Sequence, residues 1–143
     1  MVGKDLLKIL KESKYTTVLS GFEMLQENGY PAIRDGEESY DIEQKYGYSV
    51  DEMFTSAFYS TRKPQFFEFY RNELLSALDI PPGKGYLEMA KKKKKGLFQT
   101  IITRRVFGLP ERAGCKNVIN LHGSVYENYC PHCGKKYPVE YIR

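Results

Sequence analysis

Three short segments rich in β-branched and apolar residues, at positions 15–20, 97–103 and 116–123, alternate along the chain with segments of helical character. Strands that alternate with helices favour a parallel sheet with right-handed crossover connections. We therefore predict an α/β fold, in which residues 15–20 form a buried strand because they are β-branched and aromatic. A length of 143 residues suits one domain of this kind.

Helical patterns and end signals predict where the chain forms helices. Five segments have them: residues up to Ser13, 22–28, 49–60, 64–78 and 86–95. Ser49 is expected to cap the third segment, and Pro64 suits the start of the fourth. Residues 109–114 predict a short helix that ends at Gly114. Residues 32–47 lack apolar periodicity, so we expect a long loop there.

Charge and hydropathy exclude several classes of protein. The 22 Lys and Arg exceed the 18 Asp and Glu by only +4, which is too mild to indicate nucleic-acid binding. No apolar run approaches the ~18 residues of a membrane-spanning helix, and the N-terminus lacks the apolar region of a secretory signal. We expect a cytoplasmic protein without membrane or nucleic-acid partners. The five lysines at 91–95 point all around a helix axis, which is typical of a solvated helix end.

Cys130 and Cys133 form a C-x-x-C motif between two short β-like arms. This spacing, with a glycine after the second cysteine, is typical of half a zinc ribbon, whereas a complete zinc site needs four ligands. The other soft ligands nearby are Cys115 and His132, so one chain is expected to offer an incomplete zinc site. A redox dithiol is the alternative, but it would need a helix to begin directly after the motif, and GKKYPVEY is a poor helix start.

His122 lies at the end of the third predicted strand, where the carboxyl ends of parallel strands form a ligand-binding crevice. A histidine there is placed to act as a base near neutral pH. The alternative is a half-buried histidine that only completes hydrogen bonds at a strand end.

The turn after the first strand, Ser20-Gly21, occupies the place where a dinucleotide fold binds phosphates. Phosphates need small residues there, so that backbone N–H groups can approach them. Phe22 and Glu23 follow instead, and their bulk and negative charge oppose a phosphate. An ordinary strand-to-helix turn is therefore the alternative interpretation.

Taken together, four pieces of the chain strongly resemble the sirtuins, NAD-dependent protein lysine deacylases, and specifically their bacterial members. The pieces are VLSGFEMLQENGYPAIR, FFEFYRNELL, IITRRVFGLPERAG and KNVINLHGSVYENYCPHCGKKY. The resemblance implies a Rossmann-like domain that carries NAD, over residues 1–123 with a helical segment at 49–95. It implies the first half of a zinc ribbon over 124–143. An acyl-lysine protein is the implied substrate.

The resemblance also assigns roles to individual residues. His122 falls on the family's base, which accepts a proton from the NAD ribose once the acyl-lysine oxygen has displaced nicotinamide. Cys130 and Cys133 fall on metal ligands. The surviving cofactor contacts are Ser20, Gly21, Pro31, Arg34 and Thr103.

Three family signatures are altered. T-G-A-G-I-S reads Ser20-Gly21-Phe22-Glu23-Met24-Leu25, and P-D-F-R reads Pro31-Ala32-Ile33-Arg34. T-Q-N-I-D reads Thr103-Arg104-Arg105-Val106-Phe107, which replaces the Asn that holds the ribose and the Asp that holds the nicotinamide amide. We therefore expect weak or lost NAD binding and an impaired or inactive deacylase.

The family's second C-x-x-C, its peptide-pairing strand and its adenosine-binding strands do not follow Arg143 in this sequence. We expect an incomplete Rossmann-like sheet with an exposed edge, which proteins normally cover or pair. A homodimer or a partner that supplies the missing half would cover it. The alternative functions are a non-catalytic zinc- or partner-binding module and one half of a split sirtuin.

Overall fold

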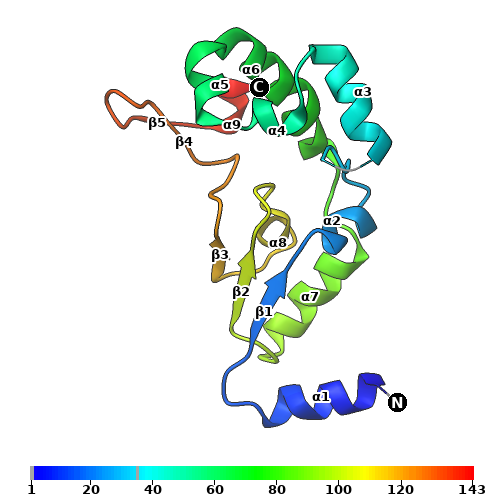
Figure 1. Cartoon of the computed structure of the whole chain (residues 1–143). Helices are drawn as coiled ribbons and strands as arrows, with labels where there is room; N and C mark the ends of the chain where they lie inside the picture. The colour runs from blue at the N-terminus through cyan, green and yellow to red at the C-terminus, as the bar shows by residue number, and fades with distance from the viewer. Residues whose placement is uncertain (1, 35) are drawn as a thin grey trace.

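A parallel three-stranded sheet lies at the centre of the chain, in a computed structural model that describes residues 2–34 and 36–143 (Figure 1). The strands are β1 (Thr17–Ser20), β2 (Thr100–Thr103) and β3 (Val118–Asn120), in the order β1-β2-β3. This confirms the predicted α/β fold and its parallel sheet.

One face of the sheet is covered by helix α7 (Lys84–Lys94). Val18, Ile101 and Val118 are paired across the three strands, and they pack in one apolar cluster with Ala90 of α7 and with Cys115. Gly96 ends this helical segment with a φ of 75°, a conformation that glycine adopts without strain. The β-branched strand residues therefore hold α7 on one side of the sheet through their apolar contacts.

The opposite face of the sheet is largely bare. Side chains alternate between faces along a strand, so the next row of paired residues, Leu19, Ile102 and Ile119, points away from α7. Leu19 is 69% exposed and Ile119 is 49% exposed. The prediction of a buried first strand is therefore wrong for this face, because within the described residues no helix packs against it.

A helical lobe lies beyond the carboxyl ends of the strands (Figure 1). Its elements are α3 (Gly36–Tyr46), α4 (Val50–Met53), α5 (Ser56–Thr61), α6 (Lys63–Phe69), the π-helical turn η1 (Tyr70–Leu74) and the 3₁₀ helix η2 (Leu75–Asp79). Five of these six elements contribute buried residues to one apolar core: Ile42, Val50, Met53, Phe58, Phe69 and Leu74. Ser49 caps α4 as predicted, because its hydroxyl accepts a hydrogen bond from the Glu52 N–H.

Helix α3 contradicts the predicted loop over residues 32–47, a stretch that includes Asp35, which lies outside the described residues. The segment has acids in its first turn and Lys45 in its last turn, which suits the helix dipole. Ile42 is its only buried residue among those described, so the helix carries almost no apolar stripe. A pattern search for apolar periodicity misses a helix of this kind.

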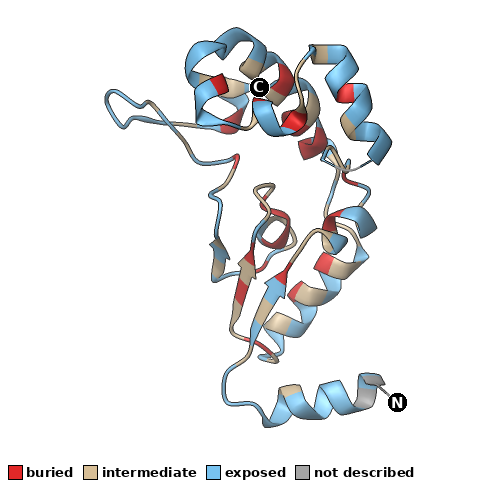
Figure 2. Cartoon of the chain, in the orientation of Figure 1, coloured by how far each residue is buried: buried red, intermediate tan, exposed pale blue. Residues whose placement is uncertain are grey.

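The remaining elements lie around this frame. Helix α1 (Val2–Glu12) exposes Leu6, Leu7 and Ile9, and most of its described residues have the colour of exposed residues in Figure 2. Helices α2 (Glu23–Glu27) and α8 (Leu109–Arg112) follow β1 and β2. Strands β4 (Asn128–Tyr129) and β5 (Lys136–Tyr137) form an antiparallel hairpin, and α9 (Val139–Ile142) follows it. No helix in the described parts of the chain has the length and apolar character needed to cross a membrane.

Candidate functional site

The carboxyl ends of the three parallel strands carry a row of polar residues, Ser20, Thr103 and Asn120, which are register partners across the sheet. Ser20 is 1% exposed and Thr103 is fully buried. The Thr103 hydroxyl accepts a hydrogen bond of 3.0 Å from the Arg105 N–H, which shapes the turn after β2. Ligands of open parallel sheets bind at this edge. The structure thus brings two residues predicted to contact the cofactor, Ser20 and Thr103, next to each other.

Four buried side-chain atoms in the described residues have no hydrogen-bond partner: Ser20 Oγ, Tyr86 OH, Arg105 Nε and Asn120 Oδ1. We call these four residues the strand-end cluster. Burial raises the pKa of Tyr86, while the Ser20 hydroxyl and the charge of Arg105 act in the opposite direction. Ser20 and Arg105 are therefore neighbours of Tyr86. Sequence reasoning missed Tyr86 and treated Arg105 only as a lost asparagine, because neither residue type signals a site by itself.

The turn after β1 is occupied by this chain's own side chains. A Cβ atom on Gly21 would lie 2.8 Å from Oε2 of Glu23, so the carboxylate lies directly against the Gly21 backbone. The Arg105 guanidinium lies 5.2 Å above the ring centre of Phe22. Glu23 therefore places a negative charge over the turn. Phe22 beside it offers an aromatic face, on which the positively charged Arg105 lies.

Phe107, which stands where the family signature has its acid, packs at the junction of three apolar clusters. Its ring centre lies 4.8 Å from that of buried Tyr30. An apolar residue here joins the helical lobe to the region beside the sheet. Phe107 therefore places an apolar core residue at the position where the family signature has an acid.

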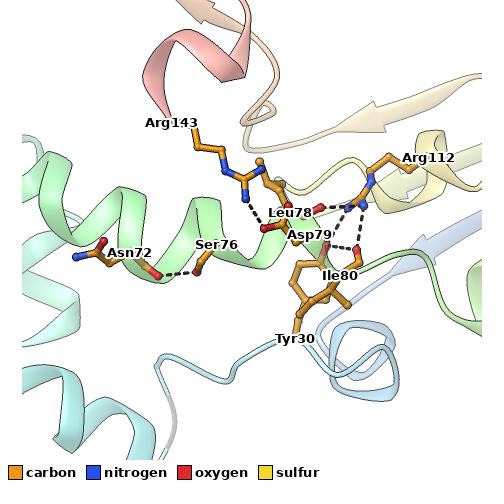
Figure 3. Close-up of polar contacts among 8 residues, drawn as sticks. All are labelled: Tyr30, Asn72, Ser76, Leu78, Asp79, Ile80, Arg112 and Arg143. Carbon is orange, nitrogen blue, oxygen red and sulfur yellow. Dashed lines mark hydrogen bonds and ion pairs between the residues drawn. The ribbon is translucent and has the colours of Figure 1, made fainter.

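Arg112 makes three hydrogen bonds that tie α8 to the end of η2 (Figure 3). Its guanidinium donates to the Tyr30 hydroxyl at 3.0 Å, to the Leu78 carbonyl at 3.0 Å and to the Ile80 carbonyl at 2.9 Å. We call this arrangement the Arg112 clamp. Burial raises the pKa of Tyr30, and the Arg112 charge opposes that shift. Sequence reasoning did not find the clamp, because its partners lie up to 82 positions away.

Pro31 and Arg34, two further residues assigned to the cofactor by resemblance, lie on exposed chain after Tyr30. Arg34 forms an ion pair with Asp51 of α4 at 3.5 Å, and its guanidinium lies 4.7 Å above the ring centre of Phe54. The described contacts of Arg34 are thus with the helical lobe and not with the strand-end cluster.

His122 lies in the turn directly after β3 and is exposed. Gly123 follows with a φ of 73°, and its N–H donates to the Asn120 carbonyl at 3.2 Å. The turn therefore places His122 just beyond the carboxyl end of β3. This exposure does not fit the alternative of a half-buried structural histidine.

An open cavity of about 410 Å³ lies beside the end of β3. Its lining residues are Gly108, Glu111, Arg112, Asn120, Ser124, Tyr126 and Glu127. Asn120 is held there by a hydrogen bond from its amide nitrogen to Oε1 of Glu111, at 2.7 Å. That bond leaves Oδ1 of Asn120 as the unpaired atom of the side chain.

The C-x-x-C motif forms the tip of the β4-β5 hairpin. The Cys130 N–H donates to the Lys135 carbonyl, and the Gly134 N–H donates to the Cys130 carbonyl, both at 2.9 Å. Backbone N–H groups of Cys133 and His132 lower the pKa of Cys130, which favours a thiolate. Cys115 lies buried under α7 instead, where burial raises its pKa. No group of three or more metal-ligating side chains is present among the described residues, so the hairpin offers two thiols.

Comparison with known proteins decides the family. A family model described as the Sir2 family matches residues 23–143. The chain belongs to the Sir2 family. The NAD-dependent protein deacetylase of Thermotoga maritima is 35% identical over 140 residues, which are 98% of this chain and 54% of that protein. The corresponding protein of Clostridium acetobutylicum is 33% identical over 138 residues, 96% of this chain and 56% of that protein.

Solved Sir2 structures have the same fold over the shared region. The structure described as "The Structural basis of Sirtuin Substrate Affinity" gives a TM-score of 0.86 at 34% identity and covers 98% of this chain and 55% of its own. The structure "Sir2-p53 peptide-NAD+" gives 0.81 at 33% identity, covering 98% and 53%. This chain therefore spans about half the length of the Sir2 proteins that it matches.

Proposed function

We propose that this chain acts in NAD-dependent removal of acyl groups from protein lysine side chains, at a rate well below that of its relatives. The observation that carries the proposal is the position of His122, exposed at the carboxyl end of β3 beside the polar row of the sheet. Membership of the Sir2 family, whose relatives are named NAD-dependent protein deacetylases, supports the same chemistry. An acyl-lysine protein is the proposed substrate.

The residues of this chain have distinct proposed roles. NAD, when bound, supplies the ribose that accepts the acyl group. His122 would take up a proton at its free imidazole nitrogen, as a general base near neutral pH. Ser20, Gly21 and Thr103 would line the cofactor at the ends of β1 and β2, with Pro31 and Arg34 approaching it from the segment after α2.

Impairment is part of the proposal, and its support is the turn at Gly21. A pyrophosphate needs free backbone N–H groups and suffers from a nearby negative charge. The Glu23 carboxylate lies against that backbone, so the turn does not fit a phosphate, whereas the polar row beside it fits a polar ligand. We expect NAD to bind with a dissociation constant above about 1 mM, equivalent to about −4 kcal/mol or weaker.

Turnover on an acetyl-lysine peptide tests the assignment of His122. We expect a slow rate for the unmodified chain and no detectable rate for His122→Ala. The matched control is His132→Ala, because His132 is the other histidine of the chain and is also exposed. An equal, nonzero rate in both variants would remove His122 from the mechanism.

Zinc binding by Cys130 and Cys133 is proposed as the structural role of residues 124–143, as half of a zinc ribbon. Zn²⁺ prefers four ligands, and one chain brings two thiols to the hairpin tip. Two chains related by a twofold axis would complete the tetrahedron. We expect one zinc ion per two chains, with dissociation of the dimer on chelation, by elemental analysis and light scattering. One zinc ion per monomer would contradict this.

A second candidate function is that of one half of a split sirtuin, which binds a partner that supplies the other half. The observation that favours it is the bare apolar row of Leu19, Ile102 and Ile119, since parallel sheets are normally covered on both faces. The proposed partner is a polypeptide that carries the Sir2 segments outside the span of this chain. Adding that segment from a relative should restore turnover and protect the β3 amides from hydrogen exchange. Absence of both effects would count against this candidate.

A further inference from the structure

The three connections that precede the strands lie at the amino edge of the parallel sheet, opposite the carboxyl edge described above (Figure 1). They are residues 13–16, 95–99 and 113–117. The first two are joined directly, because the Gln99 N–H donates to the Thr16 carbonyl at 2.9 Å. Side chains on these connections are therefore neighbours in space although they are far apart in sequence.

Five exposed lysines gather at this edge, and we call them the amino-edge patch: Lys11, Lys14, Lys94, Lys95 and Lys116. The charge of Lys94 opposes the raised pKa of buried Cys115, which directly precedes Lys116. The end of α7 therefore lies close to the third connection. The patch draws its lysines from separate segments, which a solvated end of one helix does not explain.

The carboxylates nearest to the patch already have partners of their own. Glu88 pairs with Lys91 at 2.6 Å, and Glu12 pairs with Lys8 at 4.0 Å. Glu111, the acid closest to the third connection in sequence, accepts a hydrogen bond at the carboxyl edge. None of the five lysines of the patch has an ion-pair partner among the described residues. The patch therefore keeps an excess of positive charge that attracts anions.

Helix α1 extends from the same edge and carries an apolar face that the described residues leave exposed (Figure 2). Leu6, Ile9 and Leu10 recur at helical spacing, and Leu6 and Ile9 are 54% and 60% exposed. Leu7 lines an open hollow together with Lys11 and two other polar residues of α1. Positive charge therefore borders the apolar face directly.

The end of α1 is fastened to the sheet by the two residues that precede β1. The hydroxyls of Tyr15 and Thr100 are hydrogen-bonded at 2.5 Å. The Thr16 N–H donates to the side-chain oxygen of Gln99 at 2.7 Å. The apolar face of α1 and the amino-edge patch therefore belong to the same end of the strands.

The combination of an apolar helix face with a basic border selects one kind of partner. A nucleic acid would contact the lysines through its phosphates but would leave the apolar side chains in water. A lipid surface uses both features, because the acyl-chain boundary accepts the apolar face while anionic headgroups attract the lysines. Lysine side chains are long enough to reach the headgroups beside an inserted helix.

We propose that the amino edge docks on the surface of an anionic lipid bilayer. Helix α1 lies in the headgroup region through Leu6, Leu7 and Ile9, and the amino-edge patch contacts lipid phosphates. The expectation of no membrane partner rested on the absence of a spanning segment, and a surface helix of 11 residues needs none. The proposed deacylation is not needed for this inference, since His122 lies at the opposite edge of the sheet.

Cosedimentation of the full chain with lipid vesicles tests the proposal. We expect at least about tenfold tighter binding to vesicles of phosphatidylcholine and phosphatidylglycerol, mixed at about 2 to 1, than to vesicles of phosphatidylcholine alone. Salt at about 0.5 M should weaken the binding to the mixed vesicles, because it screens the lysines. Equal binding to both kinds of vesicle would overturn the proposal.

The apolar contribution is tested by Ile9→Ser, at an exposed position where substitution leaves the fold intact. We expect this variant to bind the mixed vesicles about fivefold more weakly or less tightly still, because one apolar side chain no longer inserts. Leu87→Ser is the matched control, since Leu87 is an exposed leucine of α7 outside α1. Equal losses in the two variants would contradict docking through α1.

The charge contribution is tested by Lys95→Gln combined with Lys116→Gln. We expect about tenfold weaker binding to the mixed vesicles. The matched control combines Lys63→Gln with Lys84→Gln, which removes the same charge at exposed positions outside the patch. The control should weaken binding less than about twofold. Equal losses in both double variants would mean that net charge alone acts, and would overturn the role of the patch.

Two outcomes would assign this end of the molecule to another occupant. Tighter binding to duplex DNA than to the mixed vesicles would overturn the proposal in favour of a nucleic acid. A dimer in light scattering that Ile9→Ser dissociates, with no vesicle binding, would overturn it in favour of a second copy of this chain. The turnover assay of His122 judges the proposed function separately in each case.

Discussion

Arg112 of the clamp and Arg105 of the strand-end cluster both follow β2 in the sequence, yet the two groups treat buried polar atoms in opposite ways. Arg112 fills its hydrogen bonds with a hydroxyl and two carbonyls of the same chain. The strand-end cluster holds polar atoms with no partner in the described residues. A buried polar group with all its hydrogen bonds made stabilises the fold. A buried polar group without a partner destabilises the fold, which indicates that it is retained to contact a ligand. The difference separates structural from ligand-binding polar residues within one short stretch of chain.

Removal of the clamp should give the largest effect on stability. Arg112→Ala deletes three hydrogen bonds from a charged donor and leaves the Leu78 and Ile80 carbonyls without it. We expect the free energy of unfolding to fall by about 3 kcal/mol, measured by urea denaturation. Arg104→Ala, at an exposed position, should change it by less than about 0.5 kcal/mol. Similar losses in the two variants would show that the clamp contributes no stability.

A change at the turn should affect binding rather than stability. Glu23→Gln removes the negative charge against the Gly21 backbone and keeps the shape of the side chain. We expect NAD⁺ to bind about fivefold more tightly, equivalent to about 1 kcal/mol for relief of a partly screened repulsion. Glu37→Gln in α3 is the control for net charge. Equal effects of both variants on nucleotide affinity would mean that Glu23 acts only through the net charge.

The strand-end cluster should tolerate loss of a polar atom. Tyr86→Phe removes a buried hydroxyl that has no hydrogen-bond partner, so the free energy of unfolding should change by less than about 0.5 kcal/mol or rise slightly. A large loss of stability in urea denaturation would mean that the hydroxyl has a structural partner and that the comparison with Arg112 fails.

The smallest expected effect lies at the far end of η2, at the ion pair between Asp79 and Arg143 (Figure 3). Arg143 lowers the pKa of Asp79 below its ordinary value of 3.8. A lowered pKa stabilises the fold above pH 3.8, and that stabilisation is lost as the pH falls through the pKa of the folded state. Asp79→Asn should therefore reduce the slope of stability against pH slightly below about pH 4 and leave the slope near neutral pH unchanged. An altered slope at pH 6 to about pH 8, by thermal denaturation, would contradict this.

Short-range sequence patterns correctly predicted the elements whose formation depends on neighbouring residues in the chain. The three strands, α7 with its stop at Gly96 and the cap at Ser49 all follow from side-chain pattern and backbone preference. Helix α3 was missed because Ile42 alone is buried in it, so its helical character comes from charge and propensity. Leu19 was expected to be buried because a strand pattern does not indicate which face of a sheet is covered.

The residues of the candidate site also fall into those that the sequence predicted and those that only the fold brings together. Ser20, Thr103 and His122 could be placed at the sheet edge from sequence, because each ends or follows a predicted strand. Tyr86 could not, since its place beside Ser20 depends on how α7 packs across the sheet. Arg105 was seen only as a departure from a motif, and its position over Phe22 requires the fold.

Gly108, at the start of α8, has a consequence for how this stretch of chain can evolve. Its φ is 61°, and a Cβ atom there would lie 3.0 Å from the ring of Tyr126. Gly108 is therefore constrained twice, by its backbone conformation and by the space that Tyr126 occupies. A larger residue fits there only if both constraints are removed. A substitution at Gly108 would therefore need a compensating change at Tyr126 and a new backbone path. We expect Gly108 to be retained in descendants of this sequence, even in those where Tyr126 is replaced by a smaller residue, because the backbone constraint remains.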